Sequence, residues 1–390
     1  MKIAILTSGI LPVPAVQGGA VENLIDFYLA YNNQHRLHNI TVFSVWHHEV
    51  ENHPALQSEV NHYIYIKVNG WRAKFKKRVY QKTHGKEYYH YTIEYYLEQA
   101  LKRIKQHPYD LIILENRPGY ALKLKGETNA RMVCHLHNDM LNSDSRQGTD
   151  IYQAISKFIT VSDYVASRVR TIAPTDNKCV TVHNGIDIKA FSSHEKPQRL
   201  AALSNDDFVI VYSGRINQEK GIMELIEAMN IIGNQQPIKL IVMGSSFYGN
   251  ATNKDPFTCI LREKAEPIKD RIIFTGYIPY SDIPGYLHMA DIAVLPSMWE
   301  EPFGLTMAEA QAAGLPIITT RRGGIPEVVT EQNAIILETG EQFVNNLAAA
   351  ILDLYQHPGK REQMSKASLE HSKNYSHLRY AKDFFDAISK

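Results

Sequence analysis

The chain has 390 residues, of which 44% are hydrophobic and 21% are charged, and its formal net charge is +1. This length favours two domains, and the near-neutral charge excludes an overall bias toward nucleic acid or another polyanion. The three cysteines are far apart and odd in number, so we expect no disulfide framework or zinc site and a reducing, cytoplasmic location. The apolar run at the N-terminus is shorter than a signal peptide or a membrane span, and no other run approaches that length.

The first half of the chain alternates short apolar runs with helical patterns. Strands are predicted at residues 2–8, 40–45, 63–68, 110–115, 131–135, 158–162 and 178–183. Helices are predicted at residues 20–30, 88–106 and 163–171. This alternation predicts a parallel, doubly wound sheet.

A pair of glycines, Gly18 and Gly19, ends the loop after the first strand and directly precedes the first helix. Glycines at the head of a helix let backbone N–H groups approach a phosphate closely. A turn that needs glycine for backbone reasons alone is an equally good interpretation.

Residues 67–86 form a basic stretch without a carboxylate. Its cations are Lys67, Arg72, Lys74, Lys76, Lys77, Arg78, Lys82 and Lys86, and its interleaved apolar residues are Trp71, Phe75, Val79 and Tyr80. One interpretation is a solvated helix face. The other is a patch for an anionic membrane surface or a lipid-pyrophosphate acceptor.

Polar residues follow two neighbouring strands of the first half, where ligands gather in such sheets. Asn116-Arg117-Pro118-Gly119 follows one strand, and Leu136-His137-Asn138-Asp139 follows the next, which ends at His135. The two histidines and Asp139 could be metal ligands, and they could also be structural or catalytic residues. No third ligand group is evident at a suitable spacing, so we expect no metal site here.

The second half repeats the alternation after a polar segment, residues 189–205, which we interpret as a linker. Strands are predicted at residues 208–212, 238–243, 272–274, 291–295 and 315–320, and helices at residues 281–290, 305–313, 342–355 and 360–373 and from residue 222. The final segment, 375–389, has aromatic residues at helical spacing. We therefore predict one Rossmann-like domain over residues 1–192 and a second over residues 193–374.

Two cations flank the first strand-to-helix turn of the second domain. Arg215 follows Gly214 at the strand end, and Lys220 precedes the helix. Such a pair suits a diphosphate, although solvated loop cations would give the same pattern. Gly244 ends the next strand of this domain in the same way.

Residues 295–324 read as a strand end, an acidic loop, a helix and another strand. Gly304 leaves space at the helix N-terminus, where the free N–H groups of Leu305 and Thr306 attract an anion. Glu301 and Glu309 are unsuited to a phosphate and are better placed to accept hydrogen bonds from hydroxyls. A ligand with an anionic group between two polyols is a nucleotide sugar, in which a diphosphate joins a sugar to a ribose. The alternative interpretation of this segment is a surface helix with solvated glutamates.

The segment Glu301-Pro302-Phe303-Gly304-Leu305, with Glu309 eight positions after Glu301, resembles the signature of family-4 glycosyltransferases of the GT-B fold. The segment Ser213-Gly214-Arg215, followed by Lys220-Gly221, resembles the second signature of that family. The resemblance implies two Rossmann-like domains that face each other across a donor-binding cleft. It also implies that the terminal helix, 375–390, packs back on the first domain, although it could equally be the last helix of the second domain.

The resemblance also implies the roles of the site residues. Glu301 and the backbone of Phe303, Gly304, Leu305 and Thr306 would hold the donor sugar, and Glu309 would hold the ribose. Arg215 and Lys220, with Gly18 and Gly19, would bind the diphosphate, and the backbone near Tyr277 and Ile278 would read the uracil base. A histidine close to the donor sugar and the acceptor is implied, with His137 as the better match and His135 as the fallback.

The implied reaction is the retaining transfer of a hexose or N-acetylhexosamine from a UDP-sugar to a hydroxyl of a glycan or a polyprenyl-pyrophosphate-linked acceptor, as in capsule or exopolysaccharide synthesis. The chain contains no Asp-x-Asp motif, so we expect neither a metal nor another cofactor. Alternatives are a nucleotide-sugar-binding structural protein without turnover and an epimerase or phosphorylase of the same fold.

Overall fold

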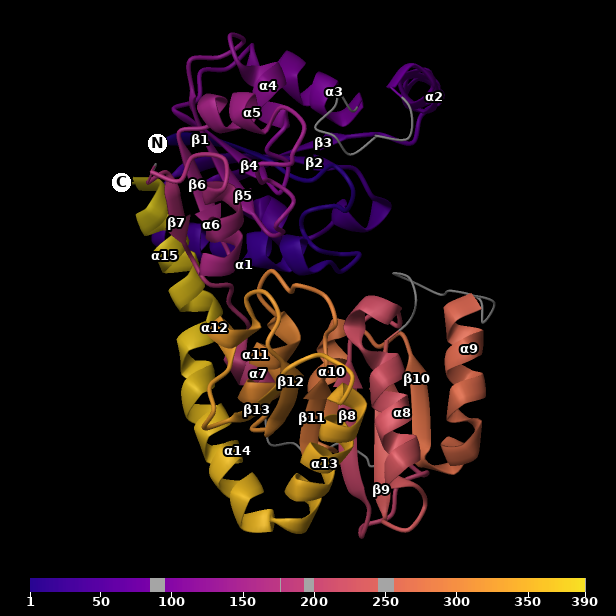
Figure 1. Ribbon diagram of the computed structural model, residues 1–390. Helices are drawn as coiled ribbons and strands as arrows, with labels where there is room; N and C mark the ends of the chain where they lie inside the picture. The colour runs from indigo at the N-terminus through magenta and orange to yellow at the C-terminus, as the bar shows by residue number, and fades with distance from the viewer. Residues whose placement is uncertain (85–94, 176, 193–199, 245–255, 390) are drawn as a thin grey trace. The chain divides into compact units, whose positions relative to one another are not determined.

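The computed structural model describes residues 1–84, 95–175, 177–192, 200–244 and 256–389. The chain forms two compact units, one made of Met1–Gly185 with His377–Lys390 and the other of Ile186–Ser376. Each unit is an α/β sheet with helices packed around it (Figure 1). The predictions that fall on residues 86, 88–94, 193–199, 245, 246 and 390 lie outside the described residues.

The first unit contains a seven-stranded parallel sheet in the order β3-β2-β1-β4-β5-β6-β7. Its central strands are buried along nearly their whole length, as in parallel sheets whose two faces are both covered. The strands are β1 (Lys2–Leu6), β2 (Asn39–Val45), β3 (Asn61–Ile66), β4 (Leu111–Glu115), β5 (Arg131–Leu136), β6 (Lys157–Thr160) and β7 (Cys179–Thr181).

The helices of the first unit are α1 (Ala20–His35), α2 (Trp71–His84), α3 (Tyr95–Ile104), α4 (Tyr120–Leu124), α5 (Gly148–Ala154), α6 (Asp163–Arg170) and α15 (His377–Ser389). The terminal helix α15 packs against α1, where the ring of Phe384 stacks on that of Tyr28 at 4.2 Å. Its last turn is held by Arg131, which donates to the carbonyl of Ile388 at 2.5 Å, and by Lys157, which donates to that of Ala387 at 2.7 Å. Cations at a helix C-terminus satisfy carbonyls that have no partner within the helix.

The second unit contains a six-stranded parallel sheet in the order β10-β9-β8-β11-β12-β13. Its strands are β8 (Phe208–Ser213), β9 (Ile238–Met243), β10 (Ile272–Gly276), β11 (Ile292–Leu295), β12 (Ile317–Thr320) and β13 (Ala334–Leu337). Its helices are α7 (Ile188–Ser192), α8 (Ile222–Ile232), α9 (Pro256–Ala265), α10 (Ile283–Leu287), α11 (Leu305–Ala312), α12 (Ile325–Val328), α13 (Phe343–Gln356) and α14 (Pro358–Ser372). Apolar side chains of β8, β9, α8 and α13 form one buried core.

The strand order reverses once in each sheet, between β1 and β4 in the first unit and between β8 and β11 in the second. Loops that leave the two strands at such a point turn to opposite faces, which leaves room for a ligand at the carboxyl ends. In the second unit these loops are residues 214–220 and 296–304. The topology alone therefore brings the two predicted motifs of this unit together.

The division between the units differs from the predicted boundary at residues 192 and 193. It falls after Gly185 because Ile186 pairs with Ser376 in a β-bridge, and because α7 packs against α10 and α11 of the second unit. The predicted linker thus begins inside a helix whose Phe191 is fully buried.

Four helices and strands of the second unit that the structure describes, α7, α9, α12 and β13, were not predicted. The strand β13 is four residues long and the helix α12 is a single turn, which are lengths at which periodicity carries little signal. Among the described residues, no helix combines the length and the apolar character that crossing a bilayer requires.

Candidate active site

Glycines at the ends of β8 and β9 let the backbone of neighbouring loops touch. The amide of Gly214 donates to the carbonyl of Met243 at 3.1 Å, and the amide of Gly244 donates to that of Gly276 at 3.0 Å. Gly244 has φ +139°, and a Cβ there would lie 1.9 Å from the Gly214 carbonyl oxygen. A side chain at residue 244 would therefore separate the two loops. Tyr277, directly after Gly276, is 49% exposed.

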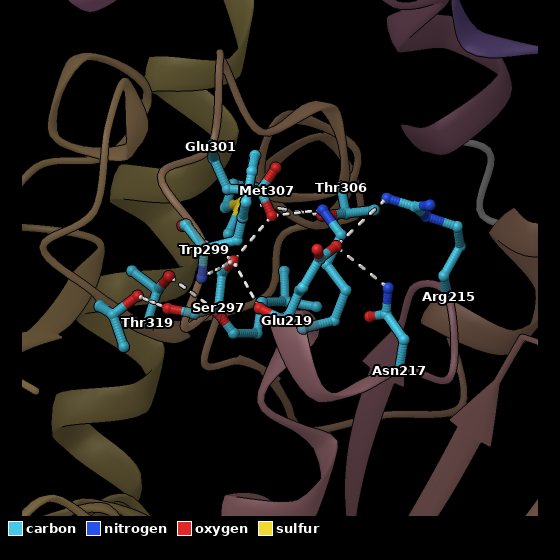
Figure 2. Close-up of polar contacts among 12 residues, drawn as sticks. Arg215, Asn217, Glu219, Ser297, Trp299, Glu301, Thr306, Met307 and Thr319 are labelled. Atoms are coloured by element: carbon cyan, nitrogen blue, oxygen red, sulfur yellow. Dashed lines mark hydrogen bonds and ion pairs between the residues drawn. The ribbon is translucent and has the colours of Figure 1, made fainter. Parts of the chain in front are cut away.

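The loops after β8 and β11 are joined through the backbone carbonyl of Glu219. This oxygen accepts hydrogen bonds from the amides of Met298 and Trp299, at 2.9 and 3.0 Å. Next to it, Gly221 has φ +70°, and a Cβ there would lie 1.8 Å from the carbonyl oxygen of Pro296. The turn that carries Lys220 is consequently fixed against the loop that carries Glu301 (Figure 2).

Lys220 and Glu301, predicted as separate site residues, form an ion pair in the structure. The same Glu301 oxygen, Oε1, accepts a hydrogen bond from the hydroxyl of Ser297 at 2.8 Å (Figure 2). The pair is partly buried, with the Lys220 side chain 22% exposed and that of Glu301 11% exposed. Arg215 is half exposed, and its guanidinium lies 3.9 Å from the carboxylate of Glu219.

The second acidic residue of this loop, Glu300, has a structural role. Its carboxylate accepts from the guanidinium of Arg322 at 2.7 Å and from the amide of Gly323 at 2.5 Å. The carbonyl of Glu301 accepts from the amide of Gly324 at 2.7 Å, and a Cβ on Gly323 would lie 2.3 Å from that carbonyl oxygen. The loop is thus fixed on both sides of Glu301.

The N-terminus of α11 follows Gly304, which adopts φ +100° and leaves the first turn without a capping side chain. Leu305 and Thr306 begin this turn and are partly exposed, and the binding of an anion by their N–H groups stays a prediction. Phe303 is predicted to contact the donor through its backbone. Its side chain is 2% exposed and packs edge-on against Tyr375 at 5.7 Å, so only its backbone can face a ligand.

Glu309 lies in the second turn of α11 and is buried. Burial raises the pKa of its carboxyl to about 8, although a hydrogen bond from the Tyr280 hydroxyl acts in the opposite direction. Tyr280 lies in a 3₁₀ turn, Tyr280–Asp282, just before α10, and its ring packs against Phe191 at 5.6 Å. A buried carboxylate with one protein donor can accept further hydrogen bonds from ligand hydroxyls.

In the first unit, Gly18 and Gly19 adopt positive φ at the head of α1. Gly19 has φ +105°, a conformation that residues with a side chain rarely adopt, so glycine is favoured there for backbone reasons alone. Glu22 is buried, and this burial raises the pKa of its carboxyl. The predicted contact of this glycine pair with a diphosphate stays a prediction.

His137 lies just after β5 and is joined to Glu115, the last residue of β4. The Nε2 atom of His137 lies 3.1 Å from Oε2 of Glu115, and Nδ1 of His135 lies 3.1 Å from the same oxygen. Glu115 and His135 are aligned partners in the parallel pairing of β4 and β5. His135 is fully buried and its ring lies 5.2 Å from that of Phe384, which argues against this residue as the one that contacts substrate.

The expectation that no third ligand group accompanies the two histidines was wrong. Glu115, which comes from a different strand, completes a group whose ligand atoms all lie within 4.8 Å of one another. Two imidazoles and a carboxylate are ligand types that suit a divalent transition metal. The spacing in the sequence does not indicate this group, because Glu115 is 20 residues from the nearer histidine. The two residues are adjacent only because the register of β4 and β5 aligns them.

Two family models match the chain in tandem, in general agreement with its two units. The model of Glycosyltransferase Family 4 matches residues 34–190, and that of glycosyl transferases group 1 matches residues 195–371. The chain belongs to the family-4, group 1 glycosyltransferases. The resemblance drawn from the motifs at residues 213–221 and 301–309 is thereby confirmed.

This glycosyltransferase has relatives along its whole length. YtcC of Bacillus subtilis (strain 168), which is named as a glycosyltransferase, is 29% identical over 384 residues, or 95% of this chain and 87% of YtcC. Spore coat protein SA of the same strain is 28% identical over 406 residues and 100% of both chains. The structure of Anabaena Alr3699/HepE in complex with UDP and glucose matches with a TM-score of 0.74 and 19% identity over 100% of both chains. This likeness confirms the predicted GT-B fold.

Three residues that contact predicted site residues of this glycosyltransferase were missed by the sequence reasoning: Ser297 and Tyr280 in the second unit, and Glu115 in the first. Ser297 lies two residues after the end of β11. Its position at the carboxyl end of a strand could have indicated it as a site residue. Tyr280 and Glu115 meet their partners only through tertiary packing, so no spacing in the sequence indicates them.

Proposed function

We propose that this glycosyltransferase transfers a hexose or N-acetylhexosamine from a UDP-sugar to a hydroxyl, with retention of the anomeric configuration. The observation that carries the proposal is the meeting of Lys220 and Glu301 at the switch point of the second sheet, beside the uncapped N-terminus of α11. A cation, a carboxylate and free N–H groups at one point match the phosphate and hydroxyl groups of a nucleotide sugar.

In this proposal the cations act on the leaving group. Negative charge develops on the departing diphosphate as the anomeric C–O bond breaks, and fixed positive groups stabilise it most in the transition state. Lys220 and Arg215 supply that charge, with the N–H groups of Leu305 and Thr306. The departing phosphate is the base that takes the proton of the attacking hydroxyl on the same face of the sugar.

The remaining contacts of the donor follow from the same site. Lys220 exchanges Glu301 for the diphosphate when the donor binds, which frees the carboxylate to accept hydrogen bonds from sugar hydroxyls. Glu309 accepts from the ribose, and the backbone at Gly244 and Tyr277 contacts the base. The choice of uridine is supported by HepE, whose solved complexes contain UDP with glucose and UDP-glucose.

The first unit contributes His137 and the Gly18-Gly19 turn to the reaction in this proposal. We assign His137 to the donor sugar or the acceptor hydroxyl, because its ring lies at the carboxyl end of β5, next to the switch point of the first sheet. Gly18 and Gly19 approach the diphosphate through their backbone. No metal ion is assigned to the diphosphate, because Lys220 and Arg215 supply the positive charge there.

For the acceptor we propose a glycan attached to a polyprenyl pyrophosphate, at the cytoplasmic face of a membrane and in cell-surface polysaccharide synthesis. The support is helix α2, which presents an apolar stripe. Trp71, Phe75 and Val79 are four residues apart, so they lie on one face of the helix, and they are 75%, 64% and 45% exposed. Ala73, about half a turn away, is buried.

Cations flank this stripe on both sides. Lys74, Arg78 and Lys82 lie along one side at helical spacing, and Arg72 and Lys76 lie on the other, where Lys76 pairs with Glu98 of α3. Exposed apolar rings between cations suit the boundary of an anionic bilayer, where each Lys or Arg contributes about 1 kcal/mol. The helix therefore supports contact with an anionic membrane in preference to a neutral one.

A donor screen tests the proposed reaction. The purified protein is incubated with UDP-, GDP- and ADP-sugars in excess EDTA, with lipid-linked and soluble sugar acceptors, and released nucleotide is measured. We expect UDP release that depends on an acceptor and persists in EDTA. Binding of nucleotide without turnover for every pair would instead indicate a binding protein. Release of sugar 1-phosphate from a glycan when inorganic phosphate is added in place of the nucleotide sugar would indicate a phosphorylase. Activity only with added Mg²⁺ or Mn²⁺ would refute metal independence.

A further inference from the structure

The buried carboxylate of Glu115 is the centre of a polar cluster in the first unit that the donor site does not explain. It accepts a hydrogen bond from the Tyr28 hydroxyl of α1 at 2.9 Å, on Oε1. The ring nitrogens of His135 and His137 face its other oxygen at 3.1 Å each. Side chains of Glu115 and His135 are 0% exposed, and that of His137 is 5% exposed.

The charge states of this cluster follow from its contacts. Burial alone would raise the pKa of Glu115, but the charge of His135 and the hydrogen bonds from both histidines outweigh burial and lower the pKa to about 2. Burial, with the nearby His135, lowers the pKa of His137 to about 4. Near neutral pH an ionised Glu115 therefore faces a neutral His137.

A neutral imidazole has one N–H group, and an ionised carboxylate can only accept hydrogen bonds. Since Nε2 of His137 faces Glu115, the proton must be on Nε2 and the lone pair on Nδ1. Among the described residues, Nδ1 of His137 is buried and has no hydrogen-bond partner. An unsatisfied buried acceptor is costly unless a ligand supplies the donor.

We propose that Glu115 is a positioning residue that holds His137 as the Nε2–H tautomer, so that Nδ1 accepts a hydrogen bond from a sugar hydroxyl. This inference rests on the proposed function, in which His137 contacts the donor sugar or the acceptor. The hydroxyl that binds Nδ1 belongs to either of these sugars, and both share the required O–H donor. Tyr28 and His135 satisfy the rest of the carboxylate and keep its orientation fixed.

The tautomer is measured directly by NMR of protein with ¹⁵N-labelled histidine, near neutral pH, with the His137 signal assigned from its loss in His137→Gln. We expect the Nε2–H form in the wild type and in Tyr28→Phe, which removes one hydrogen bond of Glu115 and leaves the bond to His137. In Glu115→Gln an amide N–H can face the ring, so the Nδ1–H form should become populated. An Nδ1–H tautomer in the wild type would overturn the proposal, whether or not Glu115→Gln folds.

Kinetics provide the second measurement. We expect kcat of Glu115→Gln to fall on the order of tenfold to a hundredfold, the scale of one hydrogen bond to a charged group, while Tyr28→Phe stays within a few-fold of the wild type. If the hydroxyl is on the donor sugar, Glu115→Gln weakens binding of the UDP-sugar but not of UDP. If the hydroxyl is on the acceptor, Glu115→Gln leaves donor binding unchanged, raises the KM for the acceptor and lowers the rate of transfer. Wild-type tautomer and kcat in folded Glu115→Gln would contradict the assignment.

Metal analysis completes the test, because the same three side chains could bind a divalent ion. The proposal expects less than stoichiometric metal in protein purified without chelator. One tightly held ion per chain, lost in Glu115→Gln, would overturn it in favour of a metal site. The NMR result does not depend on turnover, so failure of this inference is distinguishable from failure of the proposed glycosyl transfer.

Discussion

At the scale of single residues, the proposed contact of Glu309 with the ribose predicts that donor binding depends on pH. Its pKa is raised to about 8 by burial, so the free enzyme holds the neutral acid at pH 6 and increasingly the carboxylate above pH 8. Ribose hydroxyls bind a carboxylate more strongly than a neutral acid, so binding releases the proton. We therefore expect the Kd for UDP to fall by up to about tenfold per pH unit between pH 6 and pH 8 and to level off above.

Calorimetry of UDP binding at each pH checks this expectation. Glu309→Gln should bind UDP more weakly at pH 8.5 and should lose most of the pH dependence, whereas titration of the UDP phosphate itself is common to both proteins. Glu301→Ala is the matched comparison, since it should weaken binding of the UDP-sugar and spare UDP. An unchanged pH dependence in Glu309→Gln, or equal losses of UDP affinity in both variants, would contradict the two assignments.

The sequence indicates which residues gather at the site better than it indicates what they contact. Arg215, Lys220 and Glu301 lie in loops that follow strands, and Glu309 lies in the second turn of the next helix. The topology of a parallel sheet brings the loops at the carboxyl ends of its strands together. The pairing of Lys220 with Glu301 depends on how two loops pack through Glu219, which is a tertiary contact between distant residues. For the same reason Phe303 could not be recognised as a packing residue from its place in the motif.

At the scale of elements, helix α2 is the clearest candidate for an interaction surface. We expect the protein to co-sediment with liposomes that contain anionic lipid at low salt and to be released at high salt, because exposed cations lose their attraction as ions screen them. Reversing Lys74, Arg78 and Lys82 to Glu should abolish binding, and Trp71→Ala with Phe75→Ala should weaken it.

A charge-matched control lies in the second unit, where Lys360, Lys366 and Lys373 are exposed. Changing these three to Glu alters the net charge by the same amount and should leave liposome binding intact. If the α2 charge variant binds liposomes as well as the wild type does, or if the wild type does not bind them at low salt, then α2 is a solvated helix face. Either result would favour a soluble acceptor.

The elements that the sequence predicted well are the long or strongly apolar ones. Strands β1, β4, β8 and β9 are nearly continuous apolar runs, and they form the centres of the two sheets. The edge strand β13 and the short helix α7 carry too few residues for a periodic signal, so their places depend on packing against α13 and α11. This is why the unit boundary was displaced by seven residues from its predicted position.

At the scale of the whole molecule, the chain passes between its two units twice, after Gly185 and after Ser376, and α15 ends within the first unit. The order of sheets, the tandem family matches and the terminal helix agree with a glycosyltransferase of the GT-B fold. Within this fold, we propose that positive charge at the turn after β8 drives departure of the diphosphate.

The role of this charge is tested by measuring kcat of Lys220→Gln with the best donor and acceptor. Glutamine removes the charge but keeps an amide donor for Glu301, which matters because the ion pair is partly buried. Lys264→Gln is the control, since it removes an exposed paired lysine of the same unit. The account predicts that kcat falls by roughly two decades in Lys220→Gln, with a melting temperature close to wild type, and is unchanged in the control. Wild-type kcat in a folded Lys220→Gln enzyme would contradict it.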